Sequence, residues 1–177
     1  MLDNVININY YSVETARNSN LKHRPIGLGM MGFQDALYVQ NIAYCSSDAV
    51  EFADKSMELI SYHAIHASTE LAKERGSYET FEGSLWSKGI LPKDSIEILA
   101  ENRGNEYLNV DRSETLDWDT LRKKVLSDGM RNSNVMAIAP TATISNITGV
   151  TQSVEPTYQN LKFKSNSYEE YTIINTH

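Results

Sequence analysis

A row of small hydroxyl side chains follows a short apolar run in the last third of this 177-residue chain. The apolar run, residues 135–139, is typical of a short buried strand, and Pro140 ends it because proline has no N–H for a neighbouring strand. Thr141, Thr143 and Ser145 then alternate with small or apolar residues. Backbone N–H groups and hydroxyls can converge at such a turn and bind an anion, above all a phosphate. The same residues also suit an ordinary helix N-cap, so their chemistry alone leaves both interpretations open.

A glycine pattern at residues 27–32, Gly-Leu-Gly-Met-Met-Gly, satisfies the dinucleotide-binding spacing. That fingerprint needs a hydrophobic strand before it and an acidic residue about 20 positions later, at the end of the next strand. Here a polar stretch precedes the glycines, and the acids at the right distance, Asp48 and Glu51, fall in a predicted helix. We therefore interpret the glycines as positions of close packing or a bulge. The glycine pattern leaves one further candidate function, a stand-alone nucleotide-binding protein, which is the least supported of the three functions considered. Titration with a nicotinamide dinucleotide would reveal it.

Two further groups could carry metal or redox chemistry. His63, His66 and Glu70 share one helix face, but a carboxylate-bridged metal site draws Glu-x-x-His motifs from several helices, and no second set is present. We interpret them as the polar flank of an amphipathic helix and predict no metal site. The single cysteine, Cys45, excludes an internal disulfide and fits a reducing cytosol. We expect it to be a small, partly buried residue near a helix start.

The elements that must position these residues read as one α/β unit over residues 1–177, without an internal boundary or repeat. A helix is predicted from about Asp48 to Arg75, with Gly76 as its stop signal. Further helices are predicted over residues 2–10, near residues 95–101, and from after Asp117 to Gly129 with Leu121 and Val125 inward, and a short strand and turn over residues 25–32. The long helix should bury one apolar stripe: Val50, Ala53, Met57, Ile60, Ala64, Ala67 and Leu71.

Composition excludes several classes of function. The formal charge is −7, from 16 basic and 23 acidic residues, and no basic cluster indicates a nucleic-acid partner. The longest apolar runs are far shorter than the roughly 20 residues that span a bilayer, so no membrane association is expected. The first residues lack a basic region followed by an apolar core, which predicts no signal peptide and a cytoplasmic location.

The amino-acid sequences of several segments say more about the chain's family than its composition does. Residues 130–134 (Met-Arg-Asn-Ser-Asn), residues 139–145 (Ala-Pro-Thr-Ala-Thr-Ile-Ser) and residues 154–156 (Val-Glu-Pro) closely resemble the large (α) subunit of class I ribonucleotide reductases. So do residues 23–29 with Gly32, residues 74–78, and the stretches 82–84 and 88–92. The resemblance covers essentially the whole chain in the family's order. It implies a fragment of the C-terminal half of a ten-stranded α/β barrel, beginning and ending within that domain.

The resemblance also implies an activity, which is reduction of ribonucleoside diphosphates to deoxyribonucleoside diphosphates for DNA synthesis by a thiyl-radical mechanism. The family's redox cysteines lie outside the matched region, so this segment should contain no catalytic residue, and the isolated chain should be inactive. The implied partners are a ribonucleoside diphosphate substrate, the remainder of the large subunit and a small radical-generating subunit. The full enzyme would draw its radical from that metal-containing subunit and would also use a dithiol reductant and nucleoside triphosphate effectors.

The family's pattern assigns a substrate-phosphate loop to Pro140, Thr141, Ala142, Thr143 and Ile144. Backbone N–H groups should do much of the binding, because Ala142 and Ile144 have no side-chain donor, and the two threonine hydroxyls should add donors. Some family members carry more polar residues at these two positions, and the tail from Asn166 onward also departs from the family's wording. The alternative to a part of the reductase is a non-catalytic structural fragment, or one that complements a split subunit.

Overall fold

The computed structural model describes residues 1–159, 161–165 and 170–174; residues 166–169 and 175–177, in the tail that departs from the family's wording, lie outside the described residues. The chain forms two compact units, each assembled from separate stretches of sequence. Unit 1 comprises Met1–Leu28 and Lys55–Ala137, and unit 2 comprises Gly29–Asp54 and Ile138–His177. The helix α4 (Ser47–Arg75) contributes residues to both.

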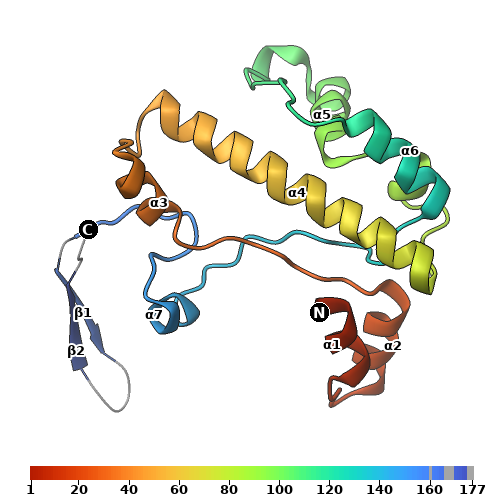
Figure 1. Cartoon of the computed structure of the whole chain (residues 1–177), viewed down its shortest axis with the longest axis horizontal. Helices are drawn as coiled ribbons and strands as arrows, with labels where there is room; N and C mark the ends of the chain where they lie inside the picture. Colours follow the sequence, from red (N-terminus) through yellow and green to blue (C-terminus); the bar gives the residue numbers. More distant parts are fainter. Residues whose placement is uncertain (160, 166–169, 175–177) are drawn as a thin grey trace. The chain divides into compact units, whose positions relative to one another are not determined.

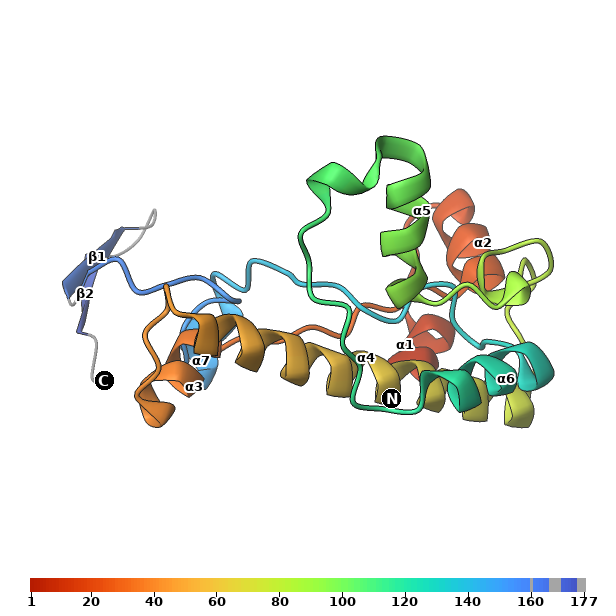
Figure 2. The same cartoon turned by 90° about the horizontal axis from the view of Figure 1, so that it is seen from above.

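Unit 1 is helical. Besides most of α4 it contains α1 (Leu2–Ile8), α2 (Glu14–His23), α5 (Ser95–Arg103) and α6 (Trp118–Asp128), with short 3₁₀ turns η1 (Trp86–Lys88), η2 (Pro92–Asp94) and η3 (Asn105–Tyr107). Helix α6 lies along the C-terminal half of α4 (Figures 1 and 2). The buried core of this unit joins these helices to the connecting chain through Ile65, Tyr78, Leu91, Trp118, Leu121, Val125, Met130 and Val135.

Three of the predicted helices in unit 1 are confirmed. Helix α6 begins after Asp117, whose carboxylate accepts the N–H of Thr120 at 3.0 Å, and it buries Leu121 and Val125 as expected. Helix α1 and helix α5 also lie where the sequence placed them. Helix α2, with a mostly polar sequence and no buried residue, was not predicted, because it lacks the apolar stripe that marks an amphipathic helix.

The extent of α4 was predicted correctly, but its buried face was not. Within unit 1 the buried residues of α4 are Ile65, Ser68, Thr69 and Ala72, whereas none of the predicted stripe is fully buried and Val50 and Ala67 are exposed. Two hydroxyls therefore face the interior. Both are satisfied there, since the Ser68 hydroxyl donates to the side-chain oxygen of Asn132 at 3.0 Å and that of Thr69 donates to a carbonyl of its own helix.

Unit 2 contains the first turns of α4, α3 (Phe33–Gln40), α7 (Ile144–Thr148) and the strands β1 (Leu161–Ser165) and β2 (Glu170–Ile174). The strands pair antiparallel, from Leu161 opposite Ile174 to Ser165 opposite Glu170. A small apolar cluster joins α3 to the start of α4, with Phe33, Leu37 and Ala49 buried at its centre. Helix α3 was not predicted either, since its eight residues offer little periodicity.

The predicted α/β fold, a partial ten-stranded α/β barrel, is wrong for the described part of the chain, which contains no parallel sheet. Residues 135–139 form no strand; Met136 makes an isolated parallel bridge to Leu28, and the only strand pair described is the antiparallel hairpin. A segment becomes a strand of a sheet through a regular series of backbone hydrogen bonds to a neighbouring strand. Here the N–H groups of Ile26, Leu28 and Ala137 bond to the carbonyls of Asn134, Val135 and Leu28, at 3.0, 2.9 and 3.0 Å. Among the described residues these bonds produce one bridge, Leu28 to Met136, and no strand.

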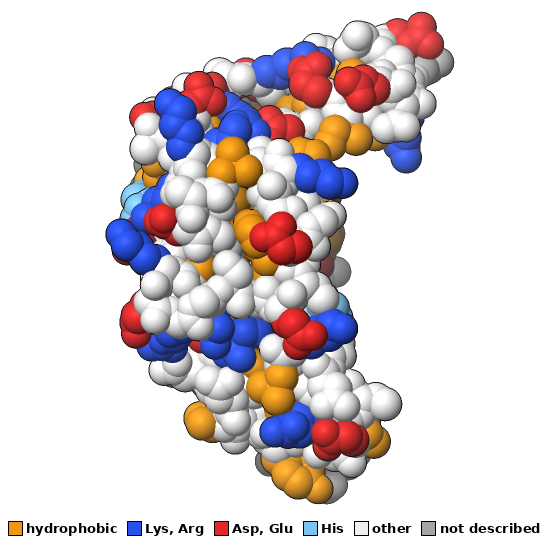
Figure 3. Space-filling view, turned by 90° about the vertical axis from the view of Figure 1, so that its right-hand side faces the viewer, with side chains coloured by type: hydrophobic (Ala, Val, Ile, Leu, Met, Phe, Trp, Pro, Cys, Tyr) orange, Lys and Arg blue, Asp and Glu red, His pale blue; other side chains and the backbone are white. Residues whose placement is uncertain are grey.

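Two surface features complete the description. On the face shown in Figure 3, acidic and basic side chains are interspersed rather than gathered by sign. Among the residues that the structure describes, no helix is both long enough and apolar enough to cross a membrane.

Candidate phosphate-binding loop

The loop at residues 140–144 lies wholly within unit 2 and leads directly into α7. Thr141 has a left-handed backbone, with φ of 54°, and Thr143, just before the helix, has right-handed helical angles. A turn that contains a left-handed residue can direct backbone N–H groups toward one side and so bind an anion. The structure therefore brings the five predicted residues together in a turn at a helix start.

The carbonyl oxygens of the loop are turned toward α7. The carbonyl of Thr141 accepts the N–H of Ser145 at 3.0 Å, and that of Thr143 accepts the N–H of Asn146 at 3.1 Å. The carbonyl of Ala142 accepts from the Asn146 side-chain amide, also at 3.0 Å. Carbonyl oxygens repel a phosphate, so occupying three of them with donors from the helix removes an obstacle to anion binding on the other side of the loop.

The outer side of the loop is accessible. Pro140, Ala142, Thr143 and Ile144 are exposed, and Thr141 is half-buried. No lysine or arginine occurs in residues 132–161, and the only charged residue there is Glu155. An anion bound to this stretch would meet backbone N–H groups and hydroxyls, without a cation from the stretch itself.

Thr141 has a second contact that the sequence did not indicate. Its Oγ1 accepts the N–H of Ser153 at 2.8 Å, and Ser153 is a buried residue that is itself left-handed, with φ of 46°. The stretch around Ser153 lies against the start of α3, where the carboxylate of Asp35 accepts the N–H of Thr151 at 2.7 Å. Ser153 and Asp35 thus belong to the support of the loop. An acid in the first turn of a helix signals only an N-terminus, so sequence reasoning could not find this role.

A buried hydroxyl lies next to the loop. Ser145, the second residue of α7, is 0% exposed, and its Oγ has no hydrogen-bond partner among the described residues. Thr151 Oγ1 and Thr157 Oγ1 share this condition. Unpaired buried hydroxyls are uncommon, and they gather here within the short stretch that follows the loop.

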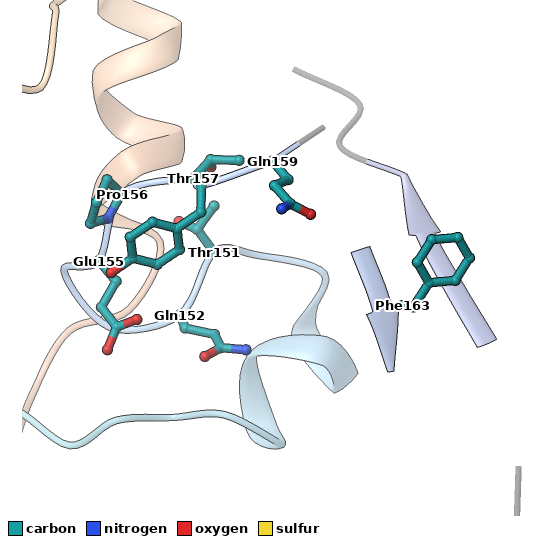
Figure 4. A pocket seen from close by; sticks show the side chains of 8 residues that line it. Thr151, Gln152, Glu155, Pro156, Thr157, Gln159 and Phe163 are labelled. Atoms are coloured by element: carbon teal, nitrogen blue, oxygen red, sulfur yellow. The ribbon is translucent and has the colours of Figure 1, made fainter. Parts of the chain in front are cut away.

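A cavity of about 320 Å³ adjoins this stretch in unit 2. Figure 4 shows that most of its lining side chains come from the extended chain after α7, with Phe163 on β1. More of the lining surface is apolar than polar, and the polar part includes Glu155 from the Val-Glu-Pro segment. Its volume exceeds what one water molecule needs, and its hydroxyl and amide groups could hold several. The lining residues are Thr151, Gln152, Glu155, Pro156, Thr157, Tyr158, Gln159 and Phe163.

The remaining candidate residues are not assembled into a site. Gly27 lies in unit 1, where an added Cβ would come within 2.8 Å of the Cβ of Ala137, and Gly32 lies in unit 2, left-handed with φ of 78°. These glycines permit close packing and a turn, in agreement with the interpretation from sequence. Glu70 pairs with Lys124, at 2.5 Å, and no group of three or more metal-ligating side chains is found among the described residues. Cys45 is exposed, so the expectation of partial burial was wrong; it lies in the turn before α4.

Other residues of the resembling segments form a polar network around the buried Asp3 in unit 1. Asp3 is 2% exposed, and its carboxylate accepts from Arg24 at 2.7 Å, from Asn132 at 3.3 Å and from Arg131 at 3.3 Å. Burial alone would raise the pKa of Asp3, but the hydrogen bond and charge of Arg24 and the charge of Arg131 outweigh it and hold the pKa below its usual value. These contacts tie α1 to the chain on either side of α4.

Comparison with known proteins identifies the chain's relatives. The whole chain, residues 1–177, matches the family described as "Ribonucleotide reductase, barrel domain". It is 58% identical over 177 residues to the ribonucleoside-diphosphate reductase subunit alpha of Chlamydia muridarum, covering 100% of this chain and 17% of that protein. It is 45% identical over 170 residues to the subunit alpha of Helicobacter pylori, covering 94% of this chain and 21% of that protein. The large subunit of Caenorhabditis elegans is 39% identical over 176 residues, which are 99% of this chain and 21% of that protein.

The chain belongs to the ribonucleotide reductase barrel-domain family. It spans about a fifth or less of the length of these curated relatives, from 17% to 21%. The family's description speaks of a barrel, but the described residues of this chain do not form one. The single uninterrupted barrel-domain segment expected over residues 1–177 stays a prediction, as does the role of the loop.

Proposed function

We propose that this chain is part of the large subunit of a ribonucleoside-diphosphate reductase and that its loop at residues 140–144 binds the diphosphate of the substrate. The observation that carries the proposal is the loop's geometry. Three of its carbonyls are occupied by donors from Ser145 and Asn146, its outer side is exposed, and its second residue, Thr141, is left-handed. That arrangement favours an anion held by neutral N–H and O–H donors.

Two groups are proposed to face the diphosphate. The first N–H groups of a helix have no acceptor within the helix, which makes that of Ile144 a candidate donor at the start of α7. Thr143, an exposed residue, lies one position earlier, and its hydroxyl adds a side-chain donor. A hydrogen bond to a charged phosphate oxygen is stronger than one between neutral groups, so a few such donors suffice for moderate affinity.

The redox part of the reaction is proposed to lie elsewhere in the enzyme. The chain has one cysteine, Cys45, which corresponds to no catalytic cysteine in the family's pattern. The remainder of the large subunit would supply the thiols, and a small subunit would supply the radical, in the cytoplasm and under control of nucleoside triphosphates. The isolated chain, mixed with a small subunit and a reductant, should therefore reduce no nucleotide, and turnover by it would contradict this assignment.

Substitutions in the complete enzyme test the loop. Ala142→Pro deletes one backbone N–H and restrains the turn, so it should weaken substrate binding more than any side-chain change in the loop. Ala142→Ser keeps the N–H and is the matched control. Thr141→Ala and Thr143→Ala should each cost about 1.5–3 kcal/mol of binding free energy, or roughly 10- to 150-fold in affinity.

The measurements are substrate affinity and turnover, with circular dichroism to verify folding. Allosteric control should be largely preserved, because the family's effector sites lie outside the matched stretch. If Ala142→Pro folds and binds substrate as well as the parent enzyme does, the loop does not hold the phosphates.

The alternative, a structural fragment or one that complements a split subunit, predicts a different result. A purely structural fragment would restore activity to a complementary polypeptide, and its Ala142→Pro variant would restore it equally well. Determining the length of the natural polypeptide separates a split subunit from a single chain.

A further inference from the structure

The two threonines of the loop differ in their surroundings. Thr143 is exposed, and its side chain makes no capping hydrogen bond to α7. Thr141 is half-buried, and its Oγ1 accepts the N–H of Ser153 at 2.8 Å. A hydroxyl carries one hydrogen and two lone pairs, so Thr141 uses an acceptor position inside the protein. The family's pattern assigns both residues to the same loop, but their contacts in the structure differ.

The bond between Thr141 and Ser153 joins two backbones that need support. Both residues are left-handed, with φ of 54° and 46°, and neither is glycine. A residue with a Cβ occupies this region at a cost, so it stays there only where its surroundings hold it. Without this bond, the Thr141 end of the loop would lose a contact that opposes its return to a commoner conformation.

Ser153 is a firm support because its neighbours are fixed on α3. The carbonyls of Thr151 and Ser153 accept the N–H groups of Gly32 and Phe33, at 2.9 and 3.4 Å, and the carboxylate of Asp35 accepts the N–H of Thr151 at 2.7 Å. Phe33 is itself part of the buried cluster of unit 2. A continuous path of contacts therefore leads from the core, through the start of α3 and residues 151–153, to Thr141.

We propose that Thr141 is a positioning residue whose side chain holds the loop in its anion-binding shape, and that Thr143 is the threonine that contacts the diphosphate. Asp35 acts with Thr141 by holding residues 151–153. This assignment rests on the proposed function of the loop and divides its side-chain roles. A loop already held in its binding conformation loses less freedom when the ligand arrives, which is how a residue that does not touch the ligand can change affinity.

The experiment compares matched variants of the complete enzyme. Thr141→Val keeps the branched shape and removes the hydroxyl, and Thr141→Ser keeps the hydroxyl. Thr143→Val is the corresponding change at the proposed contact residue. Asp35→Ala removes the acceptor for Thr151, and Asp35→Asn retains an oxygen acceptor there. The two readouts are affinity for a ribonucleoside diphosphate and hydrogen–deuterium exchange of residues 151–154 without substrate.

Thr141→Val should lower affinity by about 10-fold and speed exchange at residues 151–154, because the N–H of Ser153 loses its acceptor. Thr141→Ser should restore affinity to within about 3-fold of the parent and restore slow exchange. Thr143→Val should lower affinity by a similar factor of about 10 and leave exchange unchanged. Asp35→Ala should lower affinity in the parent and in Thr143→Val, but add less than about 2-fold to Thr141→Val, since both act through one path. Asp35→Asn should resemble the parent.

Two results would overturn the positioning role. One is a loss of affinity in Thr141→Val with no change in exchange, and the other is an Asp35→Ala effect that adds in full to that of Thr141→Val. If Thr141→Val does not fold, the positioning role is tested instead with Asp35→Ala, its control Asp35→Asn, and Thr141→Ser. Failure of the proposed function looks different: Thr141→Val speeds exchange, but neither it nor Thr143→Val changes affinity for the diphosphate.

Discussion

The buried network around Asp3 in unit 1 and the loop at residues 140–144 in unit 2 both draw on segments that resemble the same family, yet they are physically opposite. Asp3, Arg24 and Asn132 are buried and bonded to one another. The loop is largely exposed, and its first threonine is held in a left-handed conformation. The first arrangement satisfies every contact internally and stabilises the protein. The second leaves donors facing outward, which is what a ligand requires.

This difference shows two reasons why a residue can be part of a family's sequence motifs: it can stabilise the fold, or it can bind a ligand. Arg24 lies in the His-Arg-Pro segment and Asn132 in the Arg-Asn-Ser-Asn segment, and both act on the fold. Resemblance alone could not distinguish them from Thr143, since polar residues of all three kinds suit a site. Burial and partners make the distinction, and the predictions below test it through stability on one side and affinity on the other.

The largest effect on stability is expected from Asp3→Asn. It leaves the buried guanidinium of Arg24 without its charged partner, and breaking a buried ion pair costs about 3–5 kcal/mol of unfolding free energy. The measurement is urea unfolding of this chain. Glu14→Gln is the control, because Glu14 pairs with Arg17 on the surface, at 3.6 Å, and such pairs contribute about 0–1 kcal/mol. Equal losses of unfolding free energy in the two variants would show that the network around Asp3 does not stabilise the fold.

The pH dependence of this effect has a definite sign. The folded state lowers the pKa of Asp3, so its contribution is complete above its unfolded value of about 4 and disappears as the pH falls through the folded value. As the pH falls below about 4, the unfolding free energy of Asp3→Asn should therefore decrease less than that of the parent chain.

How far the sequence could lead differs between the two regions for the same reason. Helix α6 was predicted to begin after Asp117 with Leu121 and Val125 inward, and the bond that caps it joins Asp117 to Thr120, only three positions away. The buried face of α4 was misjudged because Ser68 is satisfied by Asn132, 64 residues away. The loop was predicted from its sequence motif. Its support by Asp35 was not, because Asp35 and its partner Thr151 are 116 positions apart in the sequence. Interactions between residues close in sequence could be predicted, and those between residues far apart in sequence could not.

The predicted barrel failed for a related reason. An apolar run such as residues 135–139 becomes part of a sheet only where another segment pairs with it over several residues, and periodicity does not say whether one does. In the described residues, the neighbour of this run is the stretch around Leu28, and the result is one bridge.

A second and smaller effect on stability is expected at Glu58, which fastens the chain before α6 to α4. Its carboxylate accepts the N–H groups of Thr115 and Leu116 and the indole N–H of Trp118, at 2.8, 3.1 and 2.9 Å. Burial would raise the pKa of Glu58, but these bonds, with that of the Thr115 hydroxyl, outweigh it and lower the pKa to about 2. Glu58→Gln should cost about 1.5–3 kcal/mol at neutral pH, because it weakens charge-assisted bonds.

The sign of the pH dependence again follows from a lowered pKa. The contribution of Glu58 is present above its ordinary value of 4.5 and is lost as the pH falls toward about 2. Acid unfolding followed by tryptophan fluorescence measures this, since Trp118 is a direct partner. If the parent chain and Glu58→Gln lose stability in parallel between pH 5 and about pH 2, Glu58 does not have this role.

A third effect tests whether the glycines at residues 27–32 serve packing. Gly27→Ala should cost about 1–3 kcal/mol, because its Cβ would lie 2.8 Å from that of Ala137 and one of the two backbones must shift. Gly83→Ala is the comparison, since it meets nothing within 4 Å and tests only the strain of its φ of 83°. A stable Gly27→Ala chain that has lost affinity for a nicotinamide dinucleotide would instead support the dinucleotide interpretation.

The smallest effect on stability is expected at Thr143, where the effect on binding should be large. Its side chain is exposed, and exposed substitutions away from caps and strained positions usually change the unfolding free energy by no more than about 0.5 kcal/mol. Thr143 precedes α7, but its side chain makes no capping hydrogen bond there, so Thr143→Val removes no such bond. Urea unfolding should therefore barely distinguish Thr143→Val from the parent, although affinity for the ribonucleoside diphosphate falls in the complete enzyme. Asp3→Asn should do the reverse, losing stability and, where it still folds, keeping affinity. A variant of Thr143 that destabilises the chain as much as Asp3→Asn does would place Thr143 in the architecture, and the distinction between the two regions would fail.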